Sequence, residues 1–600
     1  MDKIKVMALG GLDEDGKDLY VIEINDDIFV IGGGFKYPTK NTPGIDFIIS
    51  NFSYLKENKD RVKAYILPKG KKNSFGALPY MLKDVPAPIY CTQLTALYLN
   101  EFTASRQVTI QYDYHFFTLP ASFKIAGHQF DFFSTCASMP STFGFSIRTS
   151  LGNIVYSGDF IVEYGHDKYF KLDLNTLGKI AENPTCLLLA ESVNSTKSGY
   201  CSPSHKIYNY LVHQFKSAPG RIFVAVPSDN LYHIDEIFKA CSEFNKKLCL
   251  YDKTTKDIYA LKKHEKTPYF SSKNIVEVED ILRYKDQDLV ILLSDEGEAI
   301  YEKISLLANK ENEEKQVRIG ENDTFIMACP PSDNNEVIAT STIDEIYKSG
   351  CHVSYLTGKQ LGKMHAYEED LKMLLSLLKP KYYFPIEGYY VNLLANAKLA
   401  FEMRIGLTHS NIFLLDNGNV LNIDENGAKV NFNTDDAIAV GDVMIDGIGV
   451  GDVVNEIIND RSRLSEDGVA VLGCAVSKTT REVIAGPDVQ MRGFLFLKDK
   501  EADVMLKEIT RIFMDLVNKW VKETKTFELK RLEEQITQTI GRYLLRNSNR
   551  NPVVKPTIIV LDWFYSKFYN EWLKKPLFIT SKTPTFGQKW NFQAFLYRNH

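Results

Sequence analysis

The chain has 600 residues, of which 44% are hydrophobic and 24% are charged, and this composition excludes an intrinsically disordered protein. Six hundred residues exceed what one hydrophobic core supports, so about two to four domains are expected. The formal net charge of -5 excludes a general cationic coat for polyanions, so any nucleic-acid site is expected to be a local basic groove.

The first residues, MDKIKVMALGGLDEDGK, lack the long apolar core of a signal peptide. No stretch approaches the roughly eighteen uncharged apolar residues of a transmembrane helix, so no membrane span is expected. The nine cysteines form no CxxC pair. They are expected to be reduced, mostly buried side chains of a cytoplasmic protein.

Residues 1–205 are predicted to be the first part of a layered α/β domain. Runs typical of strands end in glycine, proline or polar residues, namely DLYVIEI, DIFVIGGG, AYILP, HQFDFFST and NIVYSGDF. Helical patterns such as FGALPYMLKD and TQLTALYLNEF lie between some of them.

From 206 to 355 strand and helix patterns alternate, which predicts a parallel sheet with covering helices. RIFVAV precedes LYHIDEIFKACSEF, DLVILLS precedes AIYEKISLLANK, and TFIMAC precedes EVIATSTIDEIYKSG. Residues 356–430, which contain EEDLKMLLSLLKPKYYFPIEG, are predicted to return to the first domain.

A polar, Gly- and Asp-rich stretch over 431–450 predicts a linker, and 451–600 predict a further α/β domain. Within that domain VAVLGCAV and PTIIVLDWF are strand-like, whereas DVMLKEITRIFMDLVNKWVKE and ELKRLEEQITQTIGRYLLR are amphipathic helices. The tail after about residue 570 mixes lysines with aromatic residues. Such a tail either docks on the protein itself or stacks on single-stranded RNA.

General motifs reveal no catalytic centre. The eleven histidines include no HxH, HxxxH or HExxH, so an imidazole-rich metal site is poorly supported. There is no GxxxxGK[ST] loop and no GxSxG elbow, and the GGG at 32–34 indicates a turn. These patterns alone describe a multidomain α/β protein without an obvious catalytic constellation.

Collinear segments spanning nearly the whole chain resemble the ribonuclease J family. They include GGLDEDGKDLYVIEINDDIFVIGGGFKYP, NIVYSGDF, LLLAESVNS, GRIFVAVPSDNLYHIDEIF, KPKYYFPIEGYY and AGPDVQMRGFLF. The resemblance implies a metallo-β-lactamase αββα core, an inserted β-CASP parallel α/β domain and a small C-terminal α/β domain. It also implies a cytoplasmic protein of RNA processing and decay, because family members cut RNA 5′→3′ and endonucleolytically with two zinc or manganese ions.

The family's metal ligands are almost all replaced. The HxHxDH motif of active members aligns with the segment LPKGKKNSFGALPYML, and a later histidine and the last histidine align further along the chain. The degenerate ligand positions are Lys69, Lys71, Asn73, Ser74, Ala137, Asp159 and Glu387. The aspartate of the family's DAG motif aligns with Gly32, and only the aspartate of the GDF motif is kept, as Asp159.

This loss bears directly on the chemistry. Two divalent cations held close together need several anionic or imidazole ligands, whereas protonated lysines repel cations and cannot ligate them. Without the metal ions nothing generates a hydroxide nucleophile near neutral pH. No metal ion or other cofactor is therefore expected, and Asp159 and Glu191 are interpreted as vestigial catalytic residues.

The resemblance also implies positions that contact RNA. They are Ser228, Asn230, Leu361, Gly362, Lys363, Met364 and His365. The last five align with the family's HxSGH phosphate clamp, of which only His365 is kept. Lys363 either contacts phosphate as a point charge or is a solvated surface lysine.

The preferred hypothesis is a catalytically inactive, RNA-binding or scaffolding subunit that assembles with an active ribonuclease J. The partners are then RNA and that relative, in a homo- or hetero-oligomeric dimer or tetramer, without a membrane. One alternative is an active or weakly active metal-dependent 5′→3′ exo- and endoribonuclease of rRNA maturation and mRNA decay, with one metal on Asp159, Glu191 and Glu387. The other is a structural or regulatory protein without RNA contact.

Charge balance predicts what fills the former metal cleft. Asp159 remains and Glu387 adds a second carboxylate, while the dications that would neutralise them are lost. A buried unpaired carboxylate is costly, so Lys69 or Lys71 is predicted to form ion pairs with these two acids. The alternative is that the loop swings outward and both lysines are solvated.

Overall fold

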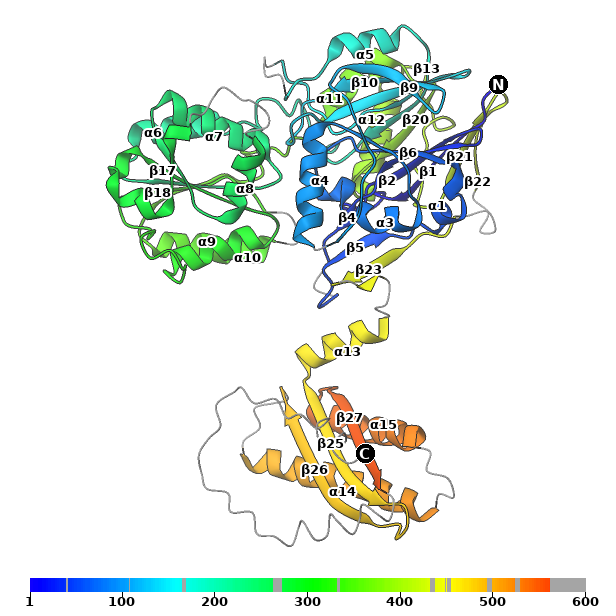
Figure 1. Ribbon diagram of the computed structural model, residues 1–600, viewed down its shortest axis with the longest axis vertical. Coiled ribbons are helices and arrows are strands. Elements are labelled where there is room, and N and C mark those ends of the chain that lie inside the picture. The colour runs from blue at the N-terminus through cyan, green and yellow to red at the C-terminus, as the bar shows by residue number, and fades with distance from the viewer. Residues whose placement is uncertain are drawn as a thin grey trace. The chain divides into compact units, whose positions relative to one another are not determined.

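A computed structural model describes most of the chain, in two units, Met1–Val453 and Val454–His600 (Figure 1). The described residues are 1–38, 42–106, 108–164, 169–262, 272–331, 335–431, 438–447, 449–450, 455–493, 499–523 and 529–561. No helix among them is long and apolar enough to cross a membrane. All nine cysteines are unpaired and buried, as the sequence predicts.

Two sheets form the centre of the first unit. The eight-stranded sheet has the order β22-β21-β1-β2-β3-β6-β7-β8. Its strands are β1 (Ile4–Gly10), β2 (Leu19–Ile24), β3 (Asp27–Gly32), β6 (Val62–Ile66), β7 (Ile89–Cys91), β8 (Tyr114–Phe116), β21 (Val420–Asp424) and β22 (Gly427–Asn431). The six-stranded sheet has the order β20-β13-β12-β11-β10-β9. Its strands are β9 (Ala121–Ile125), β10 (His128–Ser134), β11 (Phe143–Thr149), β12 (Gly152–Tyr156), β13 (Thr185–Glu191) and β20 (Tyr382–Ile386).

The two sheets share one apolar core, and helices cover their outer faces. Alternate side chains of both sheets, such as Phe29 and Phe145, are fully buried in the shared core, as expected where strand residues alternate between faces. The covering helices are α1 (Ser53–Glu57), α2 (Lys72–Phe75), α3 (Leu78–Asp84), α4 (Gln93–Ser105), α5 (Leu174–Ala181), α11 (Glu368–Leu378) and α12 (Tyr390–Glu402). Of these, α1, α3 and α4 pack on the eight-stranded sheet, and α5, α11 and α12 on the six-stranded sheet. The result is four layers in the order helix, sheet, sheet, helix.

A parallel sheet lies between β13 and β20 in the sequence. Its order is β16-β15-β17-β14-β18-β19. The elements are α6 (Tyr208–Ser217), β14 (Ile222–Pro227), α7 (Leu231–Glu243), β15 (Lys247–Leu250), α8 (Lys253–Lys262), β16 (Ile275–Val276), β17 (Leu289–Asp295), α9 (Ala299–Ala308), β18 (Thr324–Met327), α10 (Glu336–Lys348) and β19 (His352–Tyr355). Helices α6, α7 and α8 cover one face, and α9 and α10 the other. Strand and helix therefore alternate as their sequence pattern indicates.

The segment predicted as a linker, 431–450, is partly a strand. β23 (Asp442–Asp446) pairs antiparallel with β5 (Phe47–Ser50) in a small sheet with β4 (Phe35–Lys36) and β24 (Gly449–Val450). Ile445 is fully buried in the core beneath the eight-stranded sheet. The Asp- and Gly-rich sequence does not predict this strand, because β5, with which it pairs, lies far away in the chain.

The second unit has its own core. Its three-stranded sheet has the order β26-β25-β27. The elements are α13 (Asn455–Glu466), β25 (Val469–Ser477), β26 (Val483–Arg492), α14 (Asp499–Glu523), α15 (Leu529–Ser548) and β27 (Val553–Leu561). Apolar residues three or four apart on α14 and α15, among them Phe513 and Ile540, pack on β25 and β27. The basic-aromatic tail predicted after residue 570 lies outside the described residues.

Candidate functional site

Three acidic side chains converge on one lysine at the strand ends of the two large sheets. Lys69 follows β6, Asp159 follows β12 and Glu387 follows β20. The Lys69 ammonium lies 2.6 Å from Asp159 Oδ1 and 3.3 Å from Glu387 Oε2. It also lies 3.1 Å from Oδ2 of Asp18, which precedes β2. The predicted ion pairing is therefore confirmed for Lys69.

The cluster is closed off from solvent. Lys69, Asp159 and Glu387 are 1%, 2% and 4% exposed. Burial alone would lower the pKa of the Lys69 ammonium, but the surrounding carboxylates raise it well above its ordinary value. Lys69 is thus a buried cation held by its acidic neighbours.

The three carboxyl groups respond differently to the same environment. Burial raises the pKa of Asp18 to about 6 and that of Glu387 well above its usual range, although Lys69 opposes both shifts. For Asp159, Lys69 outweighs burial and holds the pKa below its ordinary value. The Tyr156 hydroxyl donates to Glu387 Oε1 at 3.2 Å. Asp159 is therefore the principal anion for the lysine.

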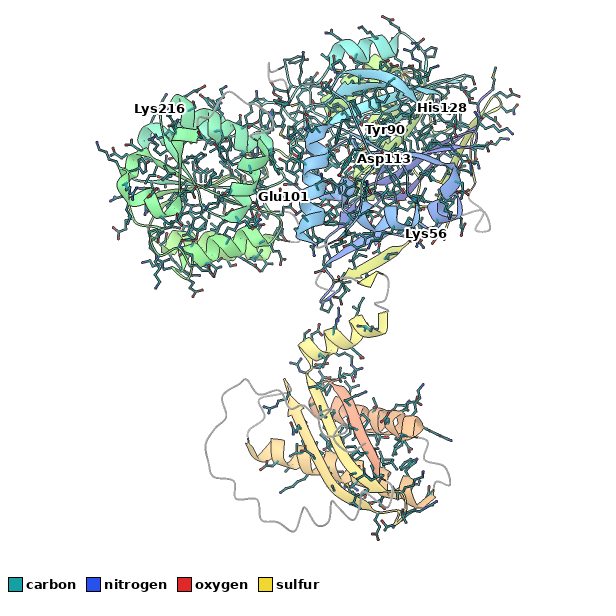
Figure 2. All side chains as sticks on the ribbon, in the orientation of Figure 1. Lys56, Tyr90, Glu101, Asp113, His128 and Lys216 are labelled. Carbon is teal, nitrogen blue, oxygen red and sulfur yellow. The ribbon has the colours of Figure 1, made fainter. Side chains whose placement is uncertain are left out.

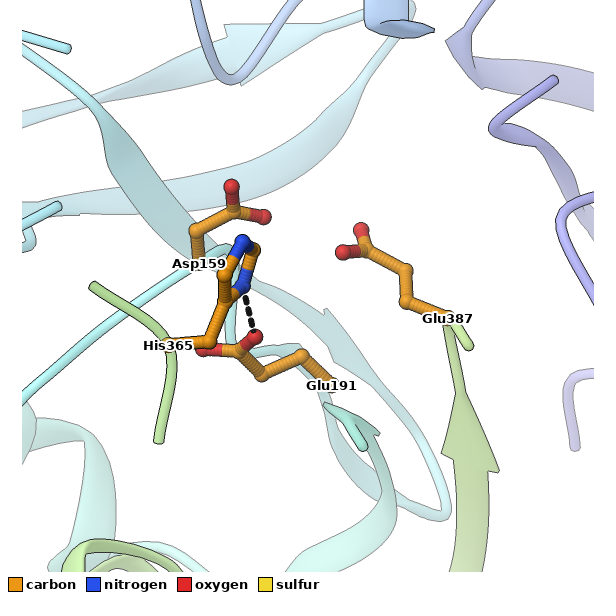
Figure 3. A group of neighbouring side chains, drawn as sticks. All are labelled: Asp159, Glu191, His365 and Glu387. Carbon is orange, nitrogen blue, oxygen red and sulfur yellow. Dashed lines mark hydrogen bonds and ion pairs between the residues drawn. The ribbon is translucent and has the colours of Figure 1, made fainter. Parts of the chain in front are cut away.

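A second pair borders the cluster. Glu191 accepts hydrogen bonds from the backbone N–H groups of Phe160 (2.8 Å) and Ala366 (3.1 Å), and its other oxygen contacts His365 Nδ1. Donor atoms of Asp159, Glu191, His365 and Glu387 all lie within 4.8 Å of one another, as Figure 3 shows. Three carboxylates and one imidazole are donor types that a divalent cation accepts.

These residues do not fit a two-metal centre. A hard divalent cation lies about 2.0–2.6 Å from its oxygen ligands. The Lys69 ammonium lies 2.6 Å from Asp159, within the range of a metal–oxygen distance, and 3.3 Å from Glu387. A metal ion bound by both carboxylates would face a buried positive charge. Lys69 thus supplies the positive charge beside Asp159 and Glu387, while Glu191 and His365 contact each other.

The remaining predicted ligand positions have other roles. The Lys71 ammonium lies 3.4 Å from Asp229 of the parallel-sheet domain, so of the two lysines considered for the pairing, Lys69 is the one that makes it. The backbone carbonyl oxygen of Asn73 accepts a hydrogen bond from the backbone N–H of Asp18 at 3.0 Å. Ser74 and Ala137 are 1% and 2% exposed and present no ionisable group.

Gly32 excludes the family's aspartate for a geometric reason. Its φ of 78° lies in the left-handed region. A Cβ atom at this position would lie 2.5 Å from the backbone oxygen of Asp18, which is closer than real Cβ atoms approach. That oxygen accepts hydrogen bonds from the N–H groups of Gly33 and Gly34. The turn therefore brings Asp18, which sequence reasoning missed, to the site.

The predicted RNA-binding residues separate into buried and exposed groups. Leu361 and Met364 are each 2% exposed and pack within an apolar core. Gly362 lies so close to the Tyr367 hydroxyl that a Cβ would meet it at 2.4 Å. Lys363 is exposed, and its carbonyl oxygen accepts from Asn194.

Ser228 and Asn230 lie at the start of α7. The Asn230 side chain accepts from the backbone N–H of His233 at 3.2 Å and so caps that helix. The Ser228 N–H donates to the carbonyl oxygen of Asp295, which joins the ends of β14 and β17. Both residues hold the loop that carries Asp229.

Residues 456–561 match the model of the ribonuclease J C-terminal domain. A protein named Ribonuclease J 2 from Staphylococcus epidermidis is 29% identical over 92% of this chain and 98% of its own length. The protein of that name from Staphylococcus aureus is 28% identical over the same shares. Over most of its length the chain is therefore similar to proteins named Ribonuclease J 2.

A solved structure described as a protein of unknown function from Enterococcus faecalis aligns with 70% of this chain and all of its own. Its sequence identity is 14% and its TM-score 0.49, so that likeness carries no argument. The likeness to ribonuclease J rests on the sequence relatives and on the matched C-terminal domain.

Proposed function

We propose that this ribonuclease J family protein is an RNA-binding or scaffolding subunit that does not hydrolyse RNA. One observation carries the proposal: the Lys69 ammonium lies between Asp159, Asp18 and Glu387, where a catalytic cation would be needed. Nucleotide hydrolysis by this family depends on metal-activated water. A lysine ammonium supplies a positive charge but, unlike a metal ion, does not lower the pKa of a bound water molecule.

The architecture fits this assignment. The four-layer part of the first unit is proposed to be the metallo-β-lactamase core, formed by 1–205 and 356–430. The parallel sheet of 206–355 is proposed to be the β-CASP domain, and 451–600 the C-terminal domain. Both named relatives carry the number 2, and the proposal places this chain with them as a cytoplasmic partner of an active ribonuclease J.

The purified protein is expected to contain substoichiometric zinc and manganese. Hydrolysis of 5′-monophosphorylated RNA should remain at background after addition of Mn²⁺ or Zn²⁺, because Lys69 repels the cation from Asp159 and Glu387. Elemental analysis and a gel-based cleavage assay check this, with an active ribonuclease J measured in parallel. The variant Asp159→Ala should show the same background rate.

A single-metal ribonuclease is the second candidate, since four donor atoms lie within 4.8 Å of one another. It requires Glu191 to release His365 and the metal to bind on the side away from Lys69. Two metal ions per chain, or robust metal-dependent cleavage that Asp159→Ala abolishes, would reject the inactive-subunit proposal in favour of an active enzyme.

Oligomers are expected to depend on the second unit. The full-length protein should associate with itself or with an active relative, and removal of 454–600 should give a smaller species in light scattering. The first unit has separate apolar cores, so the truncated protein should remain folded by circular dichroism. An unchanged particle mass after truncation would contradict the role of the second unit in assembly.

A further inference from the structure

Two buried histidines lie where the inserted parallel-sheet domain joins the four-layer core. His205 belongs to the segment between β13 and α6, and His233 belongs to the first turn of α7. Their exposed fractions are 0% and 2%. The Nε2 atom of His233 lies 2.8 Å from the backbone carbonyl oxygen of His205, to which it can only donate. His233 therefore anchors the backbone at His205.

The ring of His205 lacks the hydrogen bonds that a buried imidazole normally makes. Within the described part of the chain, neither of its ring nitrogens has a hydrogen-bond partner. Its Nε2 atom lies 3.8 Å from Oε2 of Glu163, which exceeds hydrogen-bond distance. That carboxylate is already bound by the Lys206 ammonium at 3.1 Å and by the Ser202 hydroxyl at 2.5 Å. A buried polar group without a partner is an exception in folded proteins, so His205 is a candidate for a role beyond packing.

The ring of His205 lies at a contact between the two domains. Its centroid is 5.0 Å from that of Tyr232, the residue before His233 on α7. The Tyr232 ring also packs edge-on against Phe170 of the core, with centroids 5.2 Å apart, and its backbone N–H donates to the carbonyl oxygen of Ser138 at 3.2 Å. These five residues form the histidine seam. Separation of α7 from the core at this seam breaks the contacts of Tyr232 and admits water to His205.

The surroundings of His205 disfavour a charged ring. Burial lowers the pKa of His205 to about 3, although the Glu163 carboxylate opposes this shift, and Lys206 and His233 add to it. Burial likewise lowers the pKa of His233 to about 4, although its bond to the His205 carbonyl and the charge of Asp229 oppose the shift. A solvated imidazole has a pKa of about 6.5. The closed seam therefore excludes a proton that a solvated His205 would bind in mildly acidic solution.

One further titratable group faces this segment from α7. Glu236 Oε2 accepts a hydrogen bond from the backbone N–H of Ile207 at 2.7 Å. Burial raises the pKa of Glu236 to about 7, although the N–H groups of Ile207 and Tyr208 and two nearby lysines oppose the shift. Glu236 and both N–H groups belong to the inserted domain, so their contact persists when that domain moves as a body. Glu236 is thus expected to titrate equally with the seam closed or open, whereas His205 is not.

We propose that His205 is a proton-sensitive contact: when its imidazole takes up a proton from solvent, the inserted domain separates from the four-layer core at the histidine seam. The charged ring is stable only where water solvates it, so proton uptake favours the open arrangement. Asp229 directly precedes the N-cap of α7, and its carboxylate lies 3.4 Å from the Lys71 ammonium. Opening at the seam therefore also withdraws Asp229 from the loop that carries Lys69 and Lys71. The inference does not depend on whether the protein binds RNA.

Hydrogen–deuterium exchange of the full chain, followed by mass spectrometry, measures opening at the seam. The protection factors of the amides in 201–207 and in the first turns of α7 are compared at about pH 7.5 and about pH 5.5. With a pKa of about 6.5 in the open arrangement and about 3 in the closed one, His205 raises the equilibrium constant for opening about tenfold between these pH values. Protection at the seam is expected to fall by this factor, while protection of β11 in the core stays constant.

Two variants of His205 test whether its ring is the group that binds the proton. His205→Phe keeps an aromatic ring that cannot be protonated, and it should abolish the pH dependence of protection at the seam. His205→Gln is expected to have the same effect and replaces His205→Phe if that variant does not fold. Thermal unfolding at neutral pH establishes that each variant is folded.

Two further variants are matched controls. His213→Gln removes an exposed imidazole from α6. Lys216, three residues later on that helix, lies on the part of the inserted domain away from the core (Figure 2). Glu236→Gln removes the other group that titrates in this pH range. Both controls should keep the fall of about tenfold in protection at the seam.

The outcomes either support or overturn the inference. A fall in protection that the His205 variants lose and the two controls keep supports it. Wild-type protection at the seam that is the same at both pH values overturns it, and so does an equal fall in a folded His205 variant. An equal loss of protection in β11 also overturns it, because the core then unfolds as a whole and the two domains do not separate at the seam.

Discussion

Replacing Lys69 with methionine is expected to destabilise the first unit by about 3 to 5 kcal/mol, the cost of removing one partner of a buried ion pair. The substitution keeps the length of the side chain but leaves Asp18, Asp159 and Glu387 without their shared cation. Denaturant titration followed by circular dichroism measures the change. In a two-unit protein the transition of the first unit must be resolved from that of the second, so the fragment 1–453 serves as well.

Lys71→Met is the matched control for this experiment. The two lysines are two residues apart on one loop, but the carboxylate partner of Lys71 is 45% exposed and water solvates it after the substitution. A partly exposed ion pair contributes about 0 to 1 kcal/mol. Equal effects of the two substitutions would show that the buried cluster around Lys69 does not form as described.

Two neighbouring acids are expected to differ when each is converted to its amide. Asp159→Asn should cost about 2 to 3 kcal/mol, because the pKa of Asp159 is lowered and its charged form bonds to Lys69. Glu387→Gln should cost less than about 1 kcal/mol, because the raised pKa of Glu387 favours its neutral form, which an amide resembles.

The measurement is the same unfolding experiment, carried out near neutral pH. Since Asp159 has a depressed pKa in the folded state, its contribution is complete above the unfolded-state pKa of about 3.9 and is lost as the pH falls below it. The difference between wild type and Asp159→Asn should therefore shrink in acid. A larger loss for Glu387→Gln than for Asp159→Asn would reverse the assignment of charge.

Much of the buried cluster follows from the sequence. The kept aspartate at 159 and the new glutamate at 387 require a cation once the metal ions are lost, and Lys69 is aligned with a ligand position. Asp18 does not follow from the sequence, because it stands in a polar turn without a motif. Its approach depends on the backbone hydrogen bonds from Gly33 and Gly34.

Long-range pairing explains the other differences. Lys71 pairs with Asp229, which lies in a domain that begins more than a hundred residues later. The charge balance around Asp159 cannot predict a partner in that domain. In the same way β23 is a strand because β5 supplies its hydrogen bonds. The alternating strand and helix patterns, by contrast, predict the parallel sheet well because each of its elements has a strong local period.

Gly32 also limits how the family's metal ligands can be introduced into this chain. Histidines placed at 69, 71 and 387 would restore ligand types, but an aspartate at position 32 would collide with the Asp18 backbone. Changing side chains on the present backbone is therefore insufficient, and the turn between β1 and β2 has to be redesigned together with Gly32, the last residue of β3.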